Sequence, residues 1–446
     1  MNNNNNNIHT VIGVGIGPFN LGLAALLDPV KDVSAVFFDQ KETFNWHPGL
    51  LLDYVTLQTP FLCDCVSMAD PTSPYSLLNF YKKTGRLYQF YIRENFFILR
   101  KEYNLYCKWV SQQLNSCKFS HEVDSITYKD GLYNVVVKDL KNNTVHTYHS
   151  KKLVLGTGTK PVLPNFIDKS MEDHIFHTGK YLTKKEDLLA AKEVTVIGSG
   201  QSSAEVFYDL LTQKNDKLKL QWFTRPDRIF PMEYSKLTLE LTSPDFIDYF
   251  HHMSNDMRNK MLQNQFAQFK GVNYDLINDI YDKLYEMSVG RKSLNVKIQT
   301  SSQLDNVEAK IDGSFQMYFT HTELEKPFQA TSDYVVLGTG YKYVEPKFLK
   351  GINERISRRQ DGKFNVRRNY NIGINTNDIF VQNAEIHTHS LISTDLGMGA
   401  YRNSYIINEL ADRTVYKVEK RIAFQDFSLE NIQGQDYLKP EPSLVN

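Results

Sequence analysis

The stretch Val11-Ile-Gly-Val-Gly-Ile-Gly-Pro-Phe-Asn20 decides the fold of this chain. It reads as an apolar strand that runs into a tight turn and is followed at once by a helix. Gly13, Gly15 and Gly17 would let the backbone of the turn approach a pyrophosphate, and the helix would direct its positive end at the phosphates. Because glycine-rich turns also occur for packing reasons alone, the pattern needs support from its surroundings.

The flanking residues supply that support. They predict a strand over residues 8–14, a helix from Pro18 to about residue 27 and a second strand over 35–38, which together make a compact βαβ unit. Asp39 ends the second strand, where an acid that binds a ribose hydroxyl is expected. Asn20 stands where the third glycine of the usual pattern would be. The sequence therefore predicts a dinucleotide site whose contacts are the three glycines, Pro18, Asn20 and Asp39.

A second turn of the same kind is Val194-Thr-Val-Ile-Gly-Ser-Gly-Gln-Ser-Ser203. The strand after it, residues 220–223, ends in Thr224-Arg225 rather than in an acid. A guanidinium there would pair with the 2′-phosphate of NADPH, whereas an acid would favour NADH; a solvated arginine is the alternative. A chain with two dinucleotides is most simply a flavoprotein that is reduced by a nicotinamide. The residues expected to contact the second dinucleotide are Gly198, Gly200, Gln201, Ser202, Ser203 and Arg225.

Composition narrows the class of protein. With 446 residues the chain is too long for one ordinary core, so two or three domains are expected. The 51 basic and 51 acidic residues cancel, and no overall field favours nucleic acid or an anionic membrane. No apolar stretch is long enough to span a bilayer, and the run Asn2–Asn7 is polar, so we expect an unstructured N-terminus and a cytoplasmic protein. The four cysteines lack the spacing of a zinc site or of a redox pair.

Two strands end in the same phrase, Leu-Gly-Thr-Gly, at residues 155–158 and 337–340. Such elements typically mark the places where a chain crosses between two nucleotide-binding lobes. We therefore expect an α/β protein with two Rossmann-like dinucleotide-binding domains, the second inserted into the first. The FAD domain would comprise residues 1–165 and 330–446, and the NADPH domain residues 166–330.

A small helical substrate subdomain is expected within the inserted domain, over about residues 230–292. The strand pattern is lost there, and the apolar residues are spaced for one stripe along a helix. The residues of this stripe are Phe246, Ile247, Phe250, Met253, Met257 and Met261.

Several phrases of the chain go beyond a generic protein with two dinucleotides. They closely resemble those of the bacterial N-hydroxylating flavin monooxygenases of siderophore biosynthesis, in order and over nearly the whole chain. That family includes hydroxylases of lysine, ornithine, putrescine, cadaverine and histamine. The phrases are Gly15-Ile-Gly-Pro-Phe-Asn20, Asn45-Trp-His-Pro-Gly-Leu50, Leu57-Gln-Thr59, Asp70-Pro-Thr-Ser-Pro-Tyr75, Leu155-Gly-Thr-Gly158, Gly198-Ser-Gly-Gln-Ser202 and Leu337-Gly-Thr-Gly-Tyr341.

The resemblance implies FAD and NADPH as cofactors, dioxygen and a small primary amine as reactants, and a homo-oligomer of two or four chains. NADPH would reduce FAD, dioxygen would add to the flavin as a hydroperoxide, and the amine would attack the distal oxygen. The amine must be neutral although an alkylammonium has a pKa of about 10.4 in water, so the pocket has to lower that value. Water has to be kept out, because leakage would release hydrogen peroxide.

The resemblance also assigns residues to the site. Trp46, His47 and Gln58 would line the flavin, with Gln58 close to the nicotinamide as well, and Asn273 would contact both the substrate and the nicotinamide ribose. The alternatives are a loop histidine at His47 and a helix N-cap at Asn273. Gln58 and Asn273 are therefore the predicted catalytic residues. Further cofactor contacts are implied at Gly340, Tyr341 and Leu396.

Departures from the family pattern bear on the substrate. Amino-acid hydroxylases of this family carry a lysine at the position of Cys63, and that lysine pairs with the α-carboxylate of the substrate. An asparagine used for the amino-acid head group corresponds to Leu239. Because a buried carboxylate without a partner would be costly, we expect an amine that lacks an α-carboxylate, either a putrescine- or cadaverine-type diamine or histamine. Glu240, with Asp64 and Asp395, is a candidate to receive a second ammonium, although each acid could equally be a surface or capping charge. The predicted substrate contacts are Cys63, Leu239, Glu240 and Asn273.

Other functions remain as alternatives. The first is L-lysine N6- or L-ornithine N5-monooxygenase activity, and a second is an S-oxidising or Baeyer-Villiger-type flavin monooxygenase. A third is a nucleotide-sensing binding protein without oxygen chemistry. No metal site is expected, because His387 and His389 have no convincing third ligand.

Overall fold

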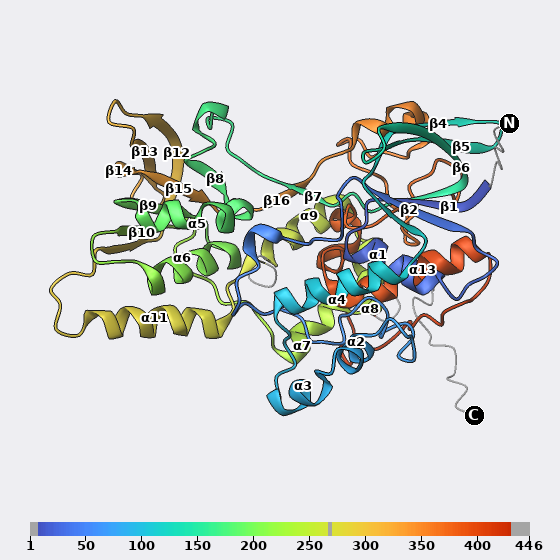
Figure 1. The fold of residues 1–446 in the computed structure, drawn as a ribbon, viewed down its shortest axis with the longest axis horizontal. Helices are drawn as coiled ribbons and strands as arrows, with labels where there is room; N and C mark the ends of the chain where they lie inside the picture. The colour runs from blue at the N-terminus through green and yellow to red at the C-terminus, as the bar shows by residue number, and fades with distance from the viewer. Residues whose placement is uncertain (1–7, 266–269, 430–446) are drawn as a thin grey trace.

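The structure is a computed structural model that describes residues 8–265 and 270–429. It contains two large separate sheets, one toward each end of the molecule (Figure 1). The polar run Asn2–Asn7, which was expected to be unstructured, lies outside the described residues. Within the described ranges, no helix is long and apolar enough to cross a membrane.

The first sheet has seven strands in the order β3-β2-β1-β6-β5-β4, with β17 beside β6. Val11 of β1 packs into one core, whereas Ile12 and Val14 pack into a core on the opposite face. A central strand that is buried on both faces explains the uninterrupted apolar run in the sequence. The strands are β1 (Ile8–Val14), β2 (Ala35–Asp39), β3 (Cys117–Phe119), β4 (His121–Lys129), β5 (Leu132–Asp139), β6 (Thr144–Leu155) and β17 (Ile379–Val381).

Helices cover one face of this sheet. α1 (Pro18–Leu27) lies against α4 (Arg100–Gln113) and α13 (Gly399–Ala411), so that the two ends of the chain share one core (Figure 1). Pro18 begins α1, as its fixed φ favours, and Gly17 is the N-cap. The predicted βαβ unit of β1, α1 and β2 is confirmed.

The second sheet has five parallel strands in the order β11-β10-β9-β15-β8. The predicted strand, helix and strand around the second turn are present as β9 (Glu193–Ile197), α6 (Gln201–Gln213) and β10 (Lys219–Phe223). The predicted α/β architecture with two Rossmann-like sheets is therefore confirmed. The other strands are β8 (Ile175–His177), β11 (Val296–Gln299) and β15 (Tyr334–Leu337), and a small antiparallel sheet of β12 (Ser302–Ala309), β13 (Phe315–His321) and β14 (Lys326–Ser332) packs on one face.

A two-stranded ribbon lies between the two sheets (Figure 1). It consists of β7 (Thr159–Pro161) and β16 (Tyr341–Tyr343), which pair antiparallel immediately after the two Leu-Gly-Thr-Gly phrases. All strands of the second sheet lie between these crossings along the chain, and β17 returns to the first sheet. This order supports the proposed insertion of one domain into the other, whose boundaries stay a prediction.

The region that was predicted to form a helical subdomain is helical, but it does not pack as one unit. α8 (Pro244–His252) and α9 (Asn255–Asn264) lie against α12 (Ile386–His389) of the C-terminal segment, whereas α11 (Tyr274–Ser288) packs on α6. The prediction of a single apolar stripe was wrong, because the Ser254 side chain caps a new helix and Met257 is 50% exposed. The remaining α-helices in the described ranges are α2 (Leu77–Lys83), α3 (Leu87–Arg93), α5 (Tyr181–Ala190) and α7 (Lys236–Leu239).

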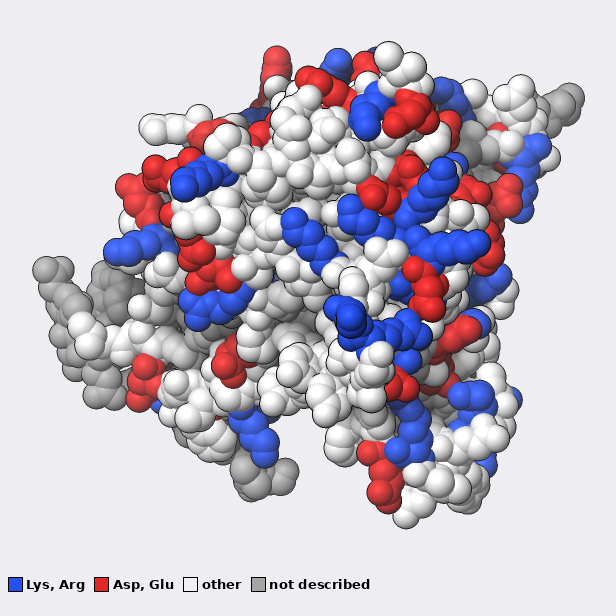
Figure 2. All heavy atoms as spheres, turned by 90° about the vertical axis from the view of Figure 1, so that its left-hand side faces the viewer, with Lys and Arg blue, Asp and Glu red and all other residues white. Residues whose placement is uncertain are grey.

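Charged side chains are intermingled on the face at the second-sheet end of the molecule. Figure 2 shows basic and acidic side chains next to one another across that face, with uncharged surface between them. The arrangement agrees with the formal net charge of zero.

Candidate active site

The three glycines of the first turn do different things. Gly13 packs against Phe37, since a Cβ on Gly13 would lie 2.0 Å from the Phe37 ring. Gly15 has a φ of +86°, and its Cβ would lie 2.5 Å from the carbonyl oxygen of Gly156, so both the turn and the close approach of β6 require glycine. No atom lies within 4 Å of a Cβ on Gly17, which borders a cavity. Gly13 is therefore a packing residue, and the predicted cofactor contact at Gly13 is not supported.

Asn20 stabilises the turn through its side chain. The amide donates hydrogen bonds to the carbonyl oxygens of Gly15 (2.7 Å) and Val14 (3.3 Å), and it accepts one from Gln382 (2.6 Å). Asn20 thus fastens the glycine turn to the C-terminal part of the chain. The asparagine in place of the third glycine therefore has a structural role. Asn20 also borders the cavity.

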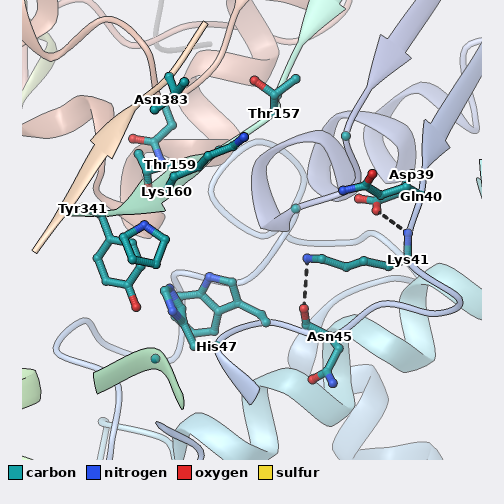
Figure 3. Close-up of a pocket in the computed structure, with 18 of the residues that line it drawn as sticks. Asp39, Gln40, Lys41, Asn45, His47, Thr157, Thr159, Lys160, Tyr341 and Asn383 are labelled. Carbon is teal, nitrogen blue, oxygen red and sulfur yellow. Dashed lines mark hydrogen bonds between the residues drawn. The ribbon is translucent and has the colours of Figure 1, made fainter. Parts of the chain in front are cut away.

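Asp39 lies at the end of β2 as predicted, and its side chain contacts the glycine turn. Its carboxylate accepts hydrogen bonds from the backbone N–H of Ile16 (2.7 Å) and of Lys41 (2.9 Å). A carboxylate has about four acceptor positions, so two remain for a ribose. Figure 3 shows Asp39 and Lys41 at one end of the cavity, with the Lys41 ammonium hydrogen-bonded to the carbonyl oxygen of Asn45 (3.2 Å).

A cavity of about 1300 Å³ opens beside this turn. It runs from Asp39 to His47 and Tyr341 (Figure 3). The predicted cofactor residues that line it are Gly15, Gly17, Pro18, Asn20, Asp39, Trp46, His47, Tyr341 and Leu396. Lining residues that the sequence did not suggest include Gln40, Lys41, Asn45, Thr157, Thr159, Lys160 and Asn383. Gly340 is not part of the lining, although the adjacent Tyr341 is.

Two neutral imidazoles and a tyrosine form the far wall of the cavity. His47 and His177 lie edge-on to the Tyr341 ring, with ring centroids 5.7 and 4.7 Å away. Burial lowers the pKa of His47 and of His177 to about 4 each. Both rings are therefore uncharged at neutral pH, which suits a site for an uncharged aromatic ring system. Trp46 is held in place by α4, because its backbone N–H donates to Asn104 (2.9 Å).

The side-chain amide nitrogen of Gln58, Nε2, is buried and has no hydrogen-bond partner among the described residues. A buried donor without a partner costs about 1–3 kcal/mol, so a bound group is expected to satisfy it. Gln58 is not part of the cavity lining, so its contact with a flavin stays a prediction.

Cys63 lies in a neutral to acidic environment. Burial raises the pKa of the Cys63 thiol to about 12, and the carboxylates of Asp395 and Asp64 add to the effect, while a hydrogen bond with Thr59 opposes it. The thiol is therefore protonated. Both charged groups that act on it are anions, so this end of the site favours a cation over a carboxylate.

Two of the three candidate acids are already used by the protein. Asp64 accepts four hydrogen bonds, from the backbone N–H of Val66, Ser67 and Leu77 and from the Ser67 hydroxyl, so it is a structural cap. Glu240 accepts hydrogen bonds from residues 424–425 and so anchors the C-terminal segment. The predicted contact of Glu240 with the amine is therefore not supported, and the same holds for Leu239, which is 45% exposed beside it.

The second glycine turn is held by close packing. A Cβ on Gly198, whose φ is +136°, would lie 2.4 Å from the Gly338 carbonyl oxygen. Ser203 sits in the place of the third glycine, and its hydroxyl is buried against both Gly198 and Gly338. Ser203 thus has a packing role, whereas Gly200 is the N-cap of α6 and Ser202 lies in its first turn, where N–H groups are available to phosphate.

Basic side chains gather at the outer end of this turn. Arg225 is exposed after β10, as the prediction requires. Burial and the nearby Arg225 lower the pKa of Lys270, so the two cations are neighbours. The Lys270 carbonyl oxygen lies 3.6 Å from a Cβ on Gly200, which places the Lys270 backbone beside the turn. The arrangement supports a phosphate contact.

A buried hydrogen-bond network joins α4 to the start of α6 and to Asn273. Arg100 of α4 makes two hydrogen bonds to Glu205 of α6, at 2.8 and 2.9 Å, and a third to the carbonyl oxygen of Leu50 (3.3 Å). The Gln201 amide donates to Glu205 (3.0 Å) and accepts from the backbone N–H of Asn273 (2.8 Å). Both ends of the Gln201 side chain are thus engaged, so that it positions Asn273, while its contact with the cofactor stays a prediction. The sequence did not predict a role for Arg100 or Glu205.

Asn273 is an N-cap, the alternative that the sequence left open. Its side chain accepts a hydrogen bond from the backbone N–H of Leu276 (3.2 Å) at the start of α11. The cap fixes the orientation of the amide. A contact with substrate or nicotinamide through the remaining N–H groups stays a prediction.

His387 and His389 are occupied by the protein. Their Nε2 atoms hydrogen-bond to the carbonyl oxygens of Phe364 (2.7 Å) and Arg368 (3.2 Å). Across residues 8–265 and 270–429, no group of three or more His, Cys, Asp and Glu side chains could hold a metal ion.

Comparison with known proteins identifies the family. Residues 7–343 match the model of the L-lysine 6-monooxygenase/L-ornithine 5-monooxygenase family. The chain belongs to this family. A putrescine N-hydroxylase from Shewanella oneidensis is 45% identical to this monooxygenase over 428 residues, which cover 95% of this chain and 85% of the relative. A second putrescine N-hydroxylase, from Acinetobacter baumannii, is 42% identical over 429 residues and 95% of each chain.

A solved structure agrees with the same family. The crystal structure of DfoA bound to FAD, the cadaverine monooxygenase of the desferrioxamine pathway from Erwinia amylovora, is similar to the monooxygenase with a TM-score of 0.93. The two are 43% identical, and the similarity covers 96% of this chain and 100% of DfoA. The family that the sequence motifs suggested is therefore confirmed.

Proposed function

We propose that this chain is an FAD- and NADPH-dependent N-monooxygenase that hydroxylates one amine of a putrescine- or cadaverine-type diamine in hydroxamate siderophore biosynthesis. Family membership supports the reaction type. Two putrescine N-hydroxylases at 42–45% identity and the structure of a cadaverine monooxygenase support a diamine as substrate. The FAD in that structure supports FAD as cofactor. The single observation of this structure that carries the proposal is the closeness of the Cys63 thiol to the Asp395 carboxylate, since a Cβ on Gly397 would lie 3.0 Å from the sulfur and 3.3 Å from Asp395 Oδ1.

The residues of the cavity suit the cofactor. Gly15 and Gly17 would admit the pyrophosphate, Asp39 would bind a ribose, and the neutral wall of His47 and Tyr341 would border the ring system. FAD, once reduced by NADPH, would supply the chemistry that activates dioxygen. The protein would hold the amine in place, favour its uncharged form and exclude water.

The substrate end of the site excludes amino acids by charge. A carboxylate near Cys63 would face Asp395 and Asp64 with no cation acting on the thiol. Removing a carboxylate from water without a partner costs several kcal/mol, which disfavours lysine and ornithine. A second ammonium, by contrast, is stabilised there. The structure thus offers a physical reason for a diamine over an α-amino acid.

The test is the product formed from a panel of amines. The holoenzyme is incubated with NADPH, oxygen and putrescine, cadaverine, histamine, lysine or ornithine, and hydroxylamine is quantified rather than NADPH consumption alone. We expect a diamine to give product with kcat/KM at least about 100-fold above lysine and ornithine, as the loss of about 3 kcal/mol would require. Product from lysine or ornithine, and none from the diamines, would contradict the proposal.

Arg225 provides a test of the nicotinamide cofactor. Because its guanidinium is expected to pair with the 2′-phosphate, Arg225→Ala should raise the KM for NADPH by about 10- to 100-fold, leave kcat nearly unchanged and leave the KM for NADH unaltered. Steady-state kinetics with both nucleotides measure this. Arg228→Ala is the matched control, since Arg228 is exposed and already paired with Asp227 (2.6 Å). Equal effects of Arg225→Ala on NADPH and NADH would contradict the assignment.

We further infer a cytoplasmic homo-oligomer that binds no nucleic acid. The balanced surface charge supports the last point. The family resemblance supports assembly, and so do the exposed side chains of Tyr88, Tyr91, Ile92 and Phe96 around α3, which leave a large apolar area uncovered in the single chain. Sedimentation of the holoenzyme measures the number of chains.

A further inference from the structure

Three acids were candidates to receive the second ammonium, and the structure separates them. The four hydrogen bonds to Asp64 satisfy its carboxylate, and Glu240 is bound to residues 424–425. Asp395 accepts one side-chain hydrogen bond, from the backbone N–H of Gly397 to Oδ1 (2.8 Å). Its Oδ2 accepts none from the described residues and is not fully enclosed. Asp395 is thus the acid with an oxygen left for a ligand.

The position of Asp395 is next to both the thiol and the flavin cavity. A Cβ on Gly397 would lie 3.0 Å from the Cys63 sulfur and 3.3 Å from Asp395 Oδ1, so the thiol and the carboxylate face each other across this glycine. Thr394 and Leu396, on either side of Asp395, line the cavity, whereas Asp395 itself lies just behind this lining. The turn 395–397 therefore brings one carboxylate to the junction of the cavity and the Cys63 end of the site.

The cation that acts on Asp395 is Arg402, whose Nη1 is paired with Glu385 while its Nε and Nη2 have no hydrogen-bond partner among the described residues. Arg402 is buried, forms an ion pair with Glu385, donates to the carbonyl oxygen of Ser393 (3.1 Å) and lies over the Phe19 ring at 4.3 Å. It lowers the pKa of Asp395, but burial has the larger and opposite effect. The Asp395 carboxylate consequently sits in a desolvated place without a direct cationic partner, where an ammonium would be strongly bound.

We infer that Asp395 binds the distal ammonium of the diamine, the nitrogen that is not hydroxylated, and that this ion pair selects diamines over monoamines of equal length. The inference deepens the proposed function and rests on it. The neutral Cys63 sulfur, which lies close to Asp395, would adjoin the same ammonium. A lysine at the position of Cys63 would pair its ammonium with the carboxylate of an amino acid. Asp395 would instead pair its carboxylate with the ammonium of a diamine.

The experiment compares Asp395→Asn with the wild-type holoenzyme on putrescine and cadaverine, and on butylamine and pentylamine as monoamines of equal carbon number. We expect kcat/KM for the diamines to fall by about 10- to 100-fold, mainly through KM, while the values for the monoamines change by less than about 3-fold. The rate of flavin reduction by NADPH without oxygen should be unchanged. Equal losses for diamines and monoamines, or no loss for either, would overturn the inference.

Controls keep the result interpretable. Glu240→Gln removes a carboxylate of the same chemistry that anchors the C-terminal segment, and it should leave the ratio of diamine to monoamine activity as in the wild type. Asp395→Ser is the second variant, because serine can also accept the Gly397 N–H and keep the turn folded. Failure of the proposed function itself would show differently, as a wild-type enzyme that forms hydroxylamine from no diamine.

Discussion

Replacing Gly15 with alanine is expected to yield a folded protein that does not retain FAD. At a φ of +86° an alanine is strained by about 1–2 kcal/mol. Its Cβ would also lie 2.5 Å from the backbone oxygen of Gly156, so the turn and β6 would have to separate. If the shift costs about 3 kcal/mol of cofactor binding, the Kd for FAD rises by about 100-fold. The flavin absorbance of the purified protein and a titration with FAD measure the loss.

Gly362→Ala is the matched control for that variant. Gly362 has a φ of +80°, close to that of Gly15, but no atom lies within 4 Å of its Cβ, so the substitution introduces the strain without the overlap. It is expected to lower stability slightly and to leave the flavin bound. Full flavin content in Gly15→Ala would show that the first turn is not where the pyrophosphate binds.

The parts of the fold that the sequence could predict are those set by neighbours along the chain. In the βαβ unit of residues 8–39, the apolar run, the glycines, Pro18 and the closing Asp39 all act over short distances, and the bounds of β1, α1 and β2 agree with prediction. The break between α8 and α9 has a local signal too. Ser254, three residues before the N–H that it caps, marks a helix start, and the apolar stripe concealed it.

The parts that the sequence could not predict depend on partners far along the chain. Glu240 was expected to face an ammonium, but its hydrogen-bond partner Phe424 is 184 residues away. Asn20 was assigned to the cofactor, yet Gln382 is the partner of its carbonyl oxygen. The sequence alone does not show which of its distant segments lie next to each other in the fold. The family resemblance supplied the reaction type, and only the geometry showed which acid remains available.

The sequence does contain a signal for one ion pair that was not predicted, the pair of Arg100 and Glu205. In Ala204-Glu-Val-Phe-Tyr-Asp-Leu210, Glu205 lies within a helix whose neighbouring residues are almost all apolar. An acid in such a place is expected to be buried with a cationic partner. The partner, Arg100, lies 105 residues earlier in the other lobe and could be identified only from the structure.

Breaking this pair is expected to have the largest effect on stability of any single change proposed. The Arg100 and Glu205 side chains are 13% and 0% exposed, and Glu205→Ala would leave the guanidinium buried without its anion. Loss of one partner of a buried pair costs about 3–5 kcal/mol. Thermal and urea unfolding of the holoenzyme, compared with wild type, measure the loss. Lys101→Ala, which removes an exposed ion pair with Asp53, is the control and should cost less than about 1 kcal/mol.

The double variant Arg100→Met/Glu205→Leu separates stability from positioning. Replacing both charges with apolar groups of similar size is expected to restore much of the stability that Glu205→Ala loses. It would still release Gln201, which Glu205 holds and which in turn holds the backbone of Asn273. We therefore expect the double variant to unfold near the wild-type temperature but to be reduced by NADPH about 10-fold more slowly, because small errors in the placement of reacting groups are costly. A stable double variant with wild-type flavin reduction would show that the network only holds the lobes together.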